Sequence, residues 1–211
     1  YDIYGFYRPN PNNDFSLEES TGTDLSITAV GDLTGTYSRA VSAVNLGTGS
    51  LSVDVTGNVV ATNSTAIAAR SQYGGDMRIS VRGDVEGLGR AIDTLNGTFN
   101  TRDGYVGSLD IYVAGNLYSQ YSDAIRGRLR YDGTLNIEVI GNLDGGGEGI
   151  EAEHRGTGTL SIDVQGNVTA NPDSGGSEGI DAEHEGSGNL TITVNGDINS
   201  GSEGILADLI G

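Results

Sequence analysis

Apolar and polar residues alternate in a short segment that recurs along most of this chain. Its clearest copy, LSIDVQGNV, runs from Leu160 to Val168 and ends in a Gly-Asn pair. Alternation with a period of two is typical of a strand that buries one face, and Gly-Asn or Gly-Asp pairs favour turns. Each copy therefore predicts a strand followed by a turn. The other copies begin at Leu25, Leu51, Met77, Leu109, Leu135 and Leu190.

A second apolar segment follows each of these strands, in which Ala or Gly precedes Val or Ile. Examples are RAVSA from Arg39 and EGILA from Glu203. The turn glycines are Gly31, Gly57, Gly83, Gly115, Gly141, Gly166 and Gly196, at spacings of 26, 26, 32, 26, 25 and 30 residues. Such a unit cannot bury its apolar face alone, but stacked units can.

No segment has a sustained helical period, which argues against crossover helices. The sequence therefore predicts an all-β fold, a parallel β-helix (β-solenoid) of about seven coils of about 26 residues. A right-handed coil is expected from the general preference of parallel crossovers.

The repeats also predict the domain organisation. Residues 22–211 form one β-solenoid domain, which we expect to continue beyond this sequence because the last repeat stops before its next strand. Residues 1–21 lack the repeat and predict an N-terminal cap or extension, since solenoids need their open ends covered. The longer spacings predict loops around residues 98–105 and 171–176.

Charge is unevenly distributed. The net charge is −18, and residues 132–211 carry 15 acidic residues and 1 arginine. We expect no nucleic-acid partner, because such a chain repels polyanions. The chain has no cysteine, which excludes disulfides and thiolate zinc sites. No apolar run approaches the 18 residues of a membrane-spanning helix.

Carboxylates and histidines recur in the doubled segment EGIEAEH, residues 148–154, and EGIDAEH, residues 178–184. Stacking of the coils would place these copies side by side, with like charges about 5 Å apart. Such charges repel unless they are solvated, partly protonated or bridged by a cation. The candidate metal ligands are Glu151, Glu153, His154, Asp181, Glu183 and His184.

Three interpretations of this segment stay open. The simplest is a solvated acidic face, copied when a repeat was duplicated. Weak calcium binding would suit the carboxylate oxygens. Zinc could use the two histidines with Glu153 or Glu183. Beyond weak calcium, we expect no cofactor.

The middle of the chain is rich in arginine and tyrosine, the residues that most often anchor binding interfaces. This composition predicts either a ligand-binding patch or a few surface side chains that balance acidic neighbours. The candidate ligand-binding residues are Arg102, Tyr105, Tyr112, Tyr118, Tyr121, Arg126, Arg128, Arg130 and Tyr131.

The residue after each turn glycine is Asp or Asn, which predicts a structural ladder of hydrogen bonds along the solenoid axis. Together with the GI.A segment and the absence of cysteine, the LxIxVxGNV strand resembles the passenger domains of bacterial autotransporters (type V secretion) and filamentous-haemagglutinin-like adhesins. The resemblance covers residues 22–211.

This resemblance implies a right-handed β-helix, extracellular or on the surface of a Gram-negative bacterium, with a role in virulence. It implies a C-terminal membrane β-barrel outside this sequence. The implied partners are a host cell-surface protein, a matrix protein or a glycan, with self-association as a further option. No catalytic residues carry over, because no protease or esterase motif matches.

Three functions follow as hypotheses. The first is an adhesin or receptor-binding passenger without catalysis. The second is an inert spacer that projects another domain, for which Tyr112, Arg126 and Arg128 would be dispensable. The third is an enzyme that cleaves acidic polysaccharides and resembles pectate lyases. Its acids would come from the carboxylates near Arg126, namely Asp93, Asp123, Glu148, Glu151 and Asp181.

Overall fold

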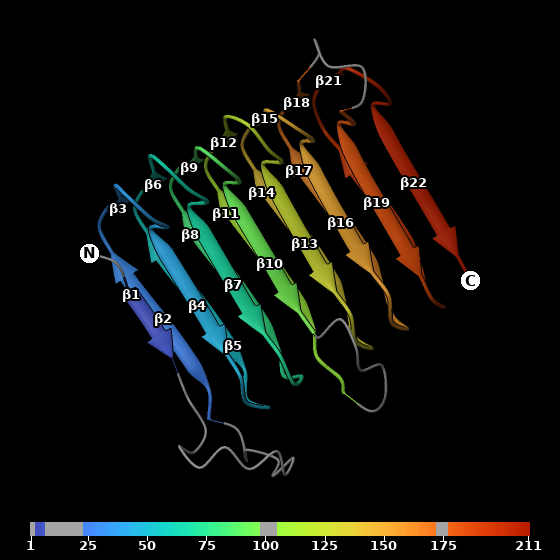
Figure 1. Cartoon of the computed structure of the whole chain (residues 1–211). Coiled ribbons are helices and arrows are strands. Elements are labelled where there is room, and N and C mark those ends of the chain that lie inside the picture. Colours follow the sequence, from blue (N-terminus) through green and yellow to red (C-terminus); the bar gives the residue numbers. More distant parts are fainter. Residues whose placement is uncertain (1–2, 7–22, 98–104, 172–176) are drawn as a thin grey trace.

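The structure is a computed structural model that describes residues 3–6, 23–97, 105–171 and 177–211. Within these ranges the chain is all-β and forms three parallel sheets that run along one axis. Figure 1 shows the strands stacked side by side, with the two termini at opposite ends of the stack. The predicted β-solenoid of about seven coils, about 26 residues apart, is confirmed.

We name the three sheets A, B and C. Each coil contributes one strand to each sheet, and along the chain the order is B, C, A. We name coil 1 for β2, β3 and β4, and number the coils onward to coil 7, formed by β20, β21 and β22. Sheet B holds β2 (Leu25–Val30), β5 (Leu51–Thr56), β8 (Met77–Arg82), β11 (Leu109–Ala114), β14 (Leu135–Ile140), β17 (Leu160–Gln165) and β20 (Leu190–Val194).

The other two sheets follow the same order. Sheet C holds the short strands β3 (Leu33–Gly35), β6 (Val59–Ala61), β9 (Val85–Gly87), β12 (Leu117–Ser119), β15 (Leu143–Gly145), β18 (Val168–Ala170) and β21 (Ile198–Ser200). Sheet A holds β1 (Ile3–Phe6), β4 (Val41–Asn45), β7 (Ile67–Ser71), β10 (Ile92–Asn96), β13 (Ile125–Leu129), β16 (Ile150–His154), β19 (Ile180–Glu185) and β22 (Ile205–Ile210).

The core follows from the period-two alternation. Leu51 pairs with Met77 and Leu109 with Leu135, so equivalent residues of successive coils stack directly. Their side chains are fully buried, as are those of the other inward-facing residues of the central coils. Because strand pairing joins each coil to the next one, the core is a continuous column inside the three sheets.

The turn after each sheet B strand explains why the repeat keeps its glycine. Gly83 has φ of +150°, and a Cβ atom there would lie 2.3 Å from the carbonyl oxygen of Gly57 in the preceding coil. Only glycine allows this backbone angle and this close approach. Gly31, in coil 1, also has positive φ, but nothing lies within 4 Å of the position that a Cβ atom would occupy there.

The predicted Asp/Asn ladder is present beside these glycines. The side chain of Asp84 accepts a hydrogen bond from the backbone N–H of Asn116 at 2.7 Å, and Asn116 accepts one from the N–H of Asn142 at 3.0 Å. Asp32, Asn58, Asn142 and Asn167 accept equivalent bonds from the next coil. Each ladder residue therefore binds the backbone of the coil that follows it.

Five of the seven coils carry a polar residue at the fifth position of their sheet A strand, which faces the interior, and leucine occupies this position in coils 4 and 7. Asn96 donates to the carbonyl oxygens of Gly75 and Ser108, at the corner between sheets A and B. In coils 5 and 6 this position is occupied by His154 and His184, which are 0% exposed. Their rings stack with centroids 4.6 Å apart, and His184 Nε2 lies 3.1 Å from the carbonyl oxygen of Gly158.

Only part of the non-repeat sequence can be compared with its prediction. Of the predicted cap, residues 3–6 form β1, which pairs in parallel with β4 at the end of sheet A. Most of the two predicted loops, residues 98–104 and 172–176, lies outside the described residues. Within the described ranges, no helix is long and apolar enough to cross a membrane.

Candidate functional site

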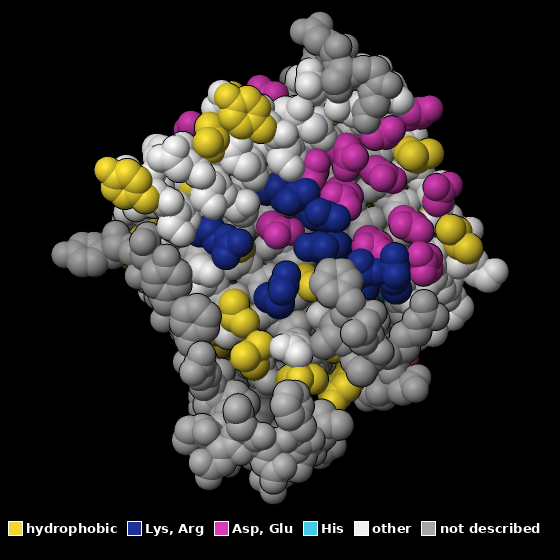
Figure 2. Space-filling view, viewed as in Figure 1, with side chains coloured by type: hydrophobic (Ala, Val, Ile, Leu, Met, Phe, Trp, Pro, Cys, Tyr) yellow, Lys and Arg dark blue, Asp and Glu magenta, His cyan; other side chains and the backbone are white. Residues whose placement is uncertain are grey.

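Most of the charged side chains that take no part in the turns or the Asp/Asn ladder lie on the outer face of sheet A. Apart from Arg78 and Arg82 on sheet B, every described arginine lies on this face or at its edge. Figure 2 shows arginines over the middle of the face and carboxylates toward its C-terminal end. This face is therefore the candidate functional surface.

Ion pairs in the middle of sheet A join neighbouring coils. Arg126 of coil 4 lies 2.9 Å from Glu151 of coil 5, and Arg128 lies 3.1 Å from Asp93 of coil 3. The pairs are partly shielded from water, since Arg128 is 8% exposed. Arg90 pairs with Asp123 in the same way, at 2.8 Å. The arginines of coil 4 are thus used to hold adjacent coils together.

Beyond coil 4, carboxylates replace arginines in the same columns. Strand register places Glu151 beside Asp181 and Glu153 beside Glu183, as the sequence predicts. Arg155 is the one described arginine of these coils. We call this set of outward carboxylates in coils 5 to 7 the acidic face; it comprises Glu148, Glu151, Glu153, Glu178, Asp181, Glu183, Glu185, Glu203 and Asp208.

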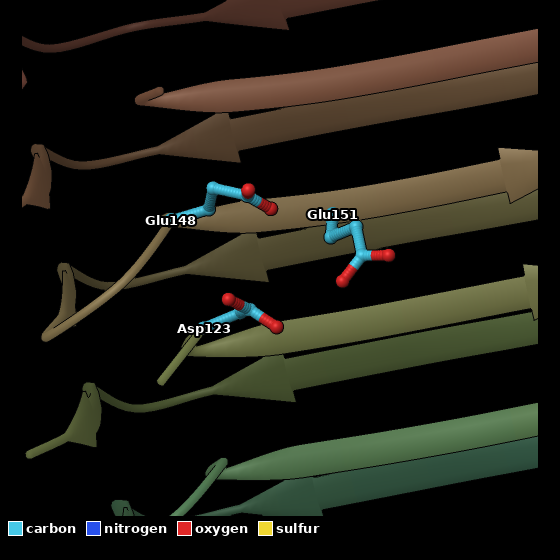
Figure 3. Close-up of side chains that lie close together, drawn as sticks. All are labelled: Asp123, Glu148 and Glu151. Carbon is cyan, nitrogen blue, oxygen red and sulfur yellow. The ribbon is translucent and has the colours of Figure 1, made fainter. Parts of the chain in front are cut away.

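Three carboxylates converge where coils 4 and 5 begin their sheet A strands. Asp123 precedes β13, Glu148 precedes β16, and Glu151 lies on β16. One oxygen from each lies within 4.8 Å of the others, and Figure 3 shows the three side chains reaching toward the same space. We call Asp123, Glu148 and Glu151 the carboxylate trio.

The trio has more carboxyl groups than arginine partners. Arg90 pairs with Asp123 and Arg126 with Glu151, whereas the buried Oε2 atom of Glu148 has no hydrogen-bond partner in the described part of the chain. Burial raises the pKa of Glu148 to about 8, and the neighbouring carboxylates add to this effect. Burial also raises the pKa of Glu151 to about 7, against the opposing charge of Arg126.

A second group of carboxylates lies further along the acidic face. Oxygens of Glu153, Glu183 and Glu185 come within 4.8 Å of one another. Arg130 and Arg155 both pair with Glu153, and Arg155 also lies 3.5 Å from Glu185. Burial raises the pKa of Glu183, and the nearby Glu185 and Glu153 act in the same direction. Like the trio, this group has three carboxylates and two arginines, but here both arginines contact the same carboxylate, that of Glu153.

The predicted zinc set does not come together. His154 and His184 point into the core, whereas Glu153 and Glu183 point outward from the same strands. Successive residues of a strand face opposite sides of the sheet, so a histidine and the glutamate before it cannot bind one ion. That part of the prediction is wrong. Of the remaining candidates, Glu151 belongs to the trio and Glu183 to the second group, while Asp181 lies beside Glu151.

The arginine and tyrosine candidates do not form one patch. Arg126, Arg128 and Arg130 gather on sheet A or at its edge, but Tyr112 lies on sheet B, below the guanidinium of Arg82. Tyr118 is on sheet C, and Tyr121 follows it in a turn, 70% exposed.

Tyr105 and Tyr131 lie near the corner between sheets A and B. Tyr131 is 1% exposed, and its hydroxyl donates to the carbonyl oxygen of Gln72, so the prediction that it faces a ligand is wrong. Tyr105 packs against Tyr131 with ring centroids 5.4 Å apart. Arg102 lies outside the described residues.

Two features of sheet A go beyond the sequence prediction, although Asp123, Glu148 and Glu151 are among the five candidate acids of the polysaccharide-cleaving hypothesis. The sequence places Asp123 and Glu148 in one column, but it does not show them as partners of Glu151 in one cluster. The cluster runs diagonally across two coils, because Asp123 precedes the sheet A strand of coil 4, whereas Glu148 and Glu151 belong to coil 5. The second feature is a hollow over β4, β7 and β10, lined in part by Arg39 and Arg70. The small residues Ser42 and Ala68 in adjacent coils could have indicated it.

Comparisons of the chain with protein-family models, with curated proteins and with solved structures found no match in any of the three. The fold defines the chain as a three-sheet parallel β-solenoid. Its function must be inferred from the geometry of sheet A.

Proposed function

We propose that this chain is a non-catalytic binding module and that the outer face of sheet A is its binding surface. In this proposal it is a passenger segment of a bacterial surface protein, as its resemblance to autotransporter passengers implies. Its acidic face binds a positively charged surface on a host or matrix protein. The observation that carries the proposal is the set of in-register carboxylates in coils 5 to 7, which outnumber the single arginine there.

Electrostatics support a cationic partner. Burial and the charges of Glu178 and Asp208 raise the pKa of Asp181, which means that its ionised form is disfavoured in the free protein. A bound cation would offset this repulsion. A surface with one sign of charge also speeds the encounter with an oppositely charged partner, and salt weakens that effect.

The test compares two variants with equal net charge. The first carries Glu178→Gln, Asp181→Asn and Glu183→Gln on the acidic face. The matched control carries Glu138→Gln, Asp144→Asn and Asp163→Asn on sheets B and C, where these side chains also point outward. The probe is a fluorescent oligolysine peptide, titrated at low and physiological salt.

We expect the sheet A variant to bind oligolysine at least about tenfold more weakly than the parent, and the control within about twofold of it. Equal weakening in both variants would show that only bulk charge acts, and would contradict a defined binding face. The parent should also bind host cells or matrix proteins saturably. If it does not, the spacer hypothesis is the better one, and replacing Tyr112, Arg126 and Arg128 by alanine should then leave the function of the protein unchanged.

Calcium binding at the carboxylate trio is a second candidate function. Three oxygens within 4.8 Å of one another can approach the 2.3–2.6 Å contact distances of Ca²⁺ after small side-chain movements. The test is a thermal melt of protein treated with EDTA, with and without Ca²⁺ or Zn²⁺. A ligand that binds only the folded state raises the midpoint of unfolding. The rise should be saturable with Ca²⁺ and absent in Glu148→Gln.

Catalysis on acidic polysaccharides remains the alternative. The trio and Arg126 bring together most of the side chains that this hypothesis needs, but Asp93 is held by Arg128. The hollow on sheet A is lined by Asp93 and by no member of the trio. Release of reducing or unsaturated sugars from a panel of acidic polysaccharides, lost in Glu148→Gln, would favour the enzyme over the binding module.

A further inference from the structure

The N-terminal half of sheet A contains a hollow that the proposed function does not use. It lies over β4, β7 and β10 and has a volume of about 260 Å³. Its cause is visible in the strand register, where Ser42 and Ala68 occupy the column that carries Arg126 and Glu151 further along. Short side chains in adjacent coils leave the space open.

The hollow combines an apolar lining with two unpaired cations. Val44 and Leu46 contribute apolar surface. Arg39 and Arg70 also line the hollow, and both are exposed. Neither takes part in an ion pair within the described residues.

The charge of the hollow is positive, in contrast to that of the whole chain. Asp93 is the one carboxylate in its lining, and Arg128 already pairs with it at 3.1 Å. Among the described residues, the two guanidinium groups therefore have no competing carboxylate and can bind an anion from solution. Arginine presents parallel N–H donors that match a carboxylate. The carboxylates of coils 5 to 7 would repel the same ligand from the other end of the sheet.

We propose that this hollow binds a carboxylate-bearing sugar unit, held by Arg39 and Arg70. The apolar side chains suit the C–H face of a sugar ring, while the Ser42 hydroxyl and the Gln72 side chain offer polar contacts for its hydroxyl groups. The volume is slightly below the roughly 300–1,000 Å³ of drug-sized ligand pockets, which suits a single ring. The site is separate from the acidic face, so either proposal can fail without the other.

The test uses glucuronic acid as the probe, with glucose and glucose 6-sulfate as comparisons. Each is titrated into the 211-residue chain, and binding is measured by NMR. We expect saturable binding of glucuronic acid, and binding of glucose at least about tenfold weaker. Arg39→Gln and Arg70→Gln should each weaken glucuronic acid binding about tenfold or more. Arg78→Gln on sheet B is the matched control, because Arg78 is also exposed and outside the ion pairs of the described residues; it should leave binding unchanged.

Ala68→Leu separates the hollow from general charge attraction. It fills the hollow from its floor, points away from the core and keeps both arginines. We expect it to weaken glucuronic acid binding about as much as the arginine variants do. The proposal is overturned if glucuronic acid does not bind, if glucose binds equally well, or if Ala68→Leu has no effect. Preferential binding of glucose 6-sulfate would overturn the assignment to a carboxylate.

Discussion

We predict that the buried His154, which stacks on His184, makes the folded protein less stable at acidic pH. In the folded protein, burial lowers the pKa of His154 from 6.5 to about 4, and the neighbouring His184 acts in the same direction. The unfolded chain therefore takes up a proton near pH 6.5 that the folded protein refuses until about pH 4. Stability is fully present above the unfolded value and is lost as the pH falls from there toward the folded value.

The size of the loss follows from the two pKa values of His154. Their difference corresponds to about 3 kcal/mol once the pH is below both, and to about 2 kcal/mol at pH 5. His154→Leu should remove this pH dependence and still fill the space, because Leu129 occupies the same column in the preceding coil and is fully buried there. His154→Asn is a second variant, in case leucine disturbs the corner, because Asn96 already occupies this column in coil 3.

Urea unfolding at pH 7 and pH 5, followed by circular dichroism at constant ionic strength, measures the effect. Carboxylates also titrate in this interval, but they do so in both proteins and largely cancel in the comparison. The parent should lose about 2 kcal/mol more than His154→Leu between the two pH values. If both proteins respond equally to acid, the buried ring does not control acid stability and the reasoning is refuted.

The remaining predictions concern the turns, the ladder and the carboxylate trio. Gly83→Ala should cost more than about 2 kcal/mol of unfolding free energy in urea, because its Cβ meets backbone, whereas Gly31→Ala meets nothing and should cost about 1 kcal/mol. Asn116→Ala should cost about 1–2 kcal/mol, because the N–H of Asn142 loses its acceptor; an unchanged urea midpoint would contradict this. Raising the pH from 4.5 to about 8 should destabilise the fold, since Glu148 must lose a proton that its folded state retains. Thermal melts of Glu148→Gln should show a smaller loss over the same range, and an equal loss would rule out this carboxylate as the cause.

The solenoid could be predicted from sequence because the spacing of the turn glycines determines which residues of successive coils pair. Once those glycines are stacked, Glu151 must lie beside Asp181 and Glu153 beside Glu183, as the structure confirms. The ladder could be predicted for the same reason, since its residues immediately follow the glycines. These features depend only on the backbone repeat.

The candidate site was predicted less well because it depends on where side chains point and how far they reach. Counting by two from Ile150 would have placed His154 inside with Ala152, and so excluded the zinc set. The approach of Asp123 to Glu148 and Glu151 could not be counted in this way, because it joins residues at the strand edge to one within the strand. Burial of Tyr131 depends on the path of the chain around a corner.

The Asp/Asn ladder gives the stack a direction. Asp84 binds the backbone N–H of Asn116, and Asn116 binds that of Asn142, so each coil prepares a hydrogen-bond acceptor for the coil on its C-terminal side. A newly added coil therefore meets a surface that already carries these acceptors. A chain synthesised from its N-terminus can thus assemble coil by coil, with each finished coil presenting its acceptors to the next one.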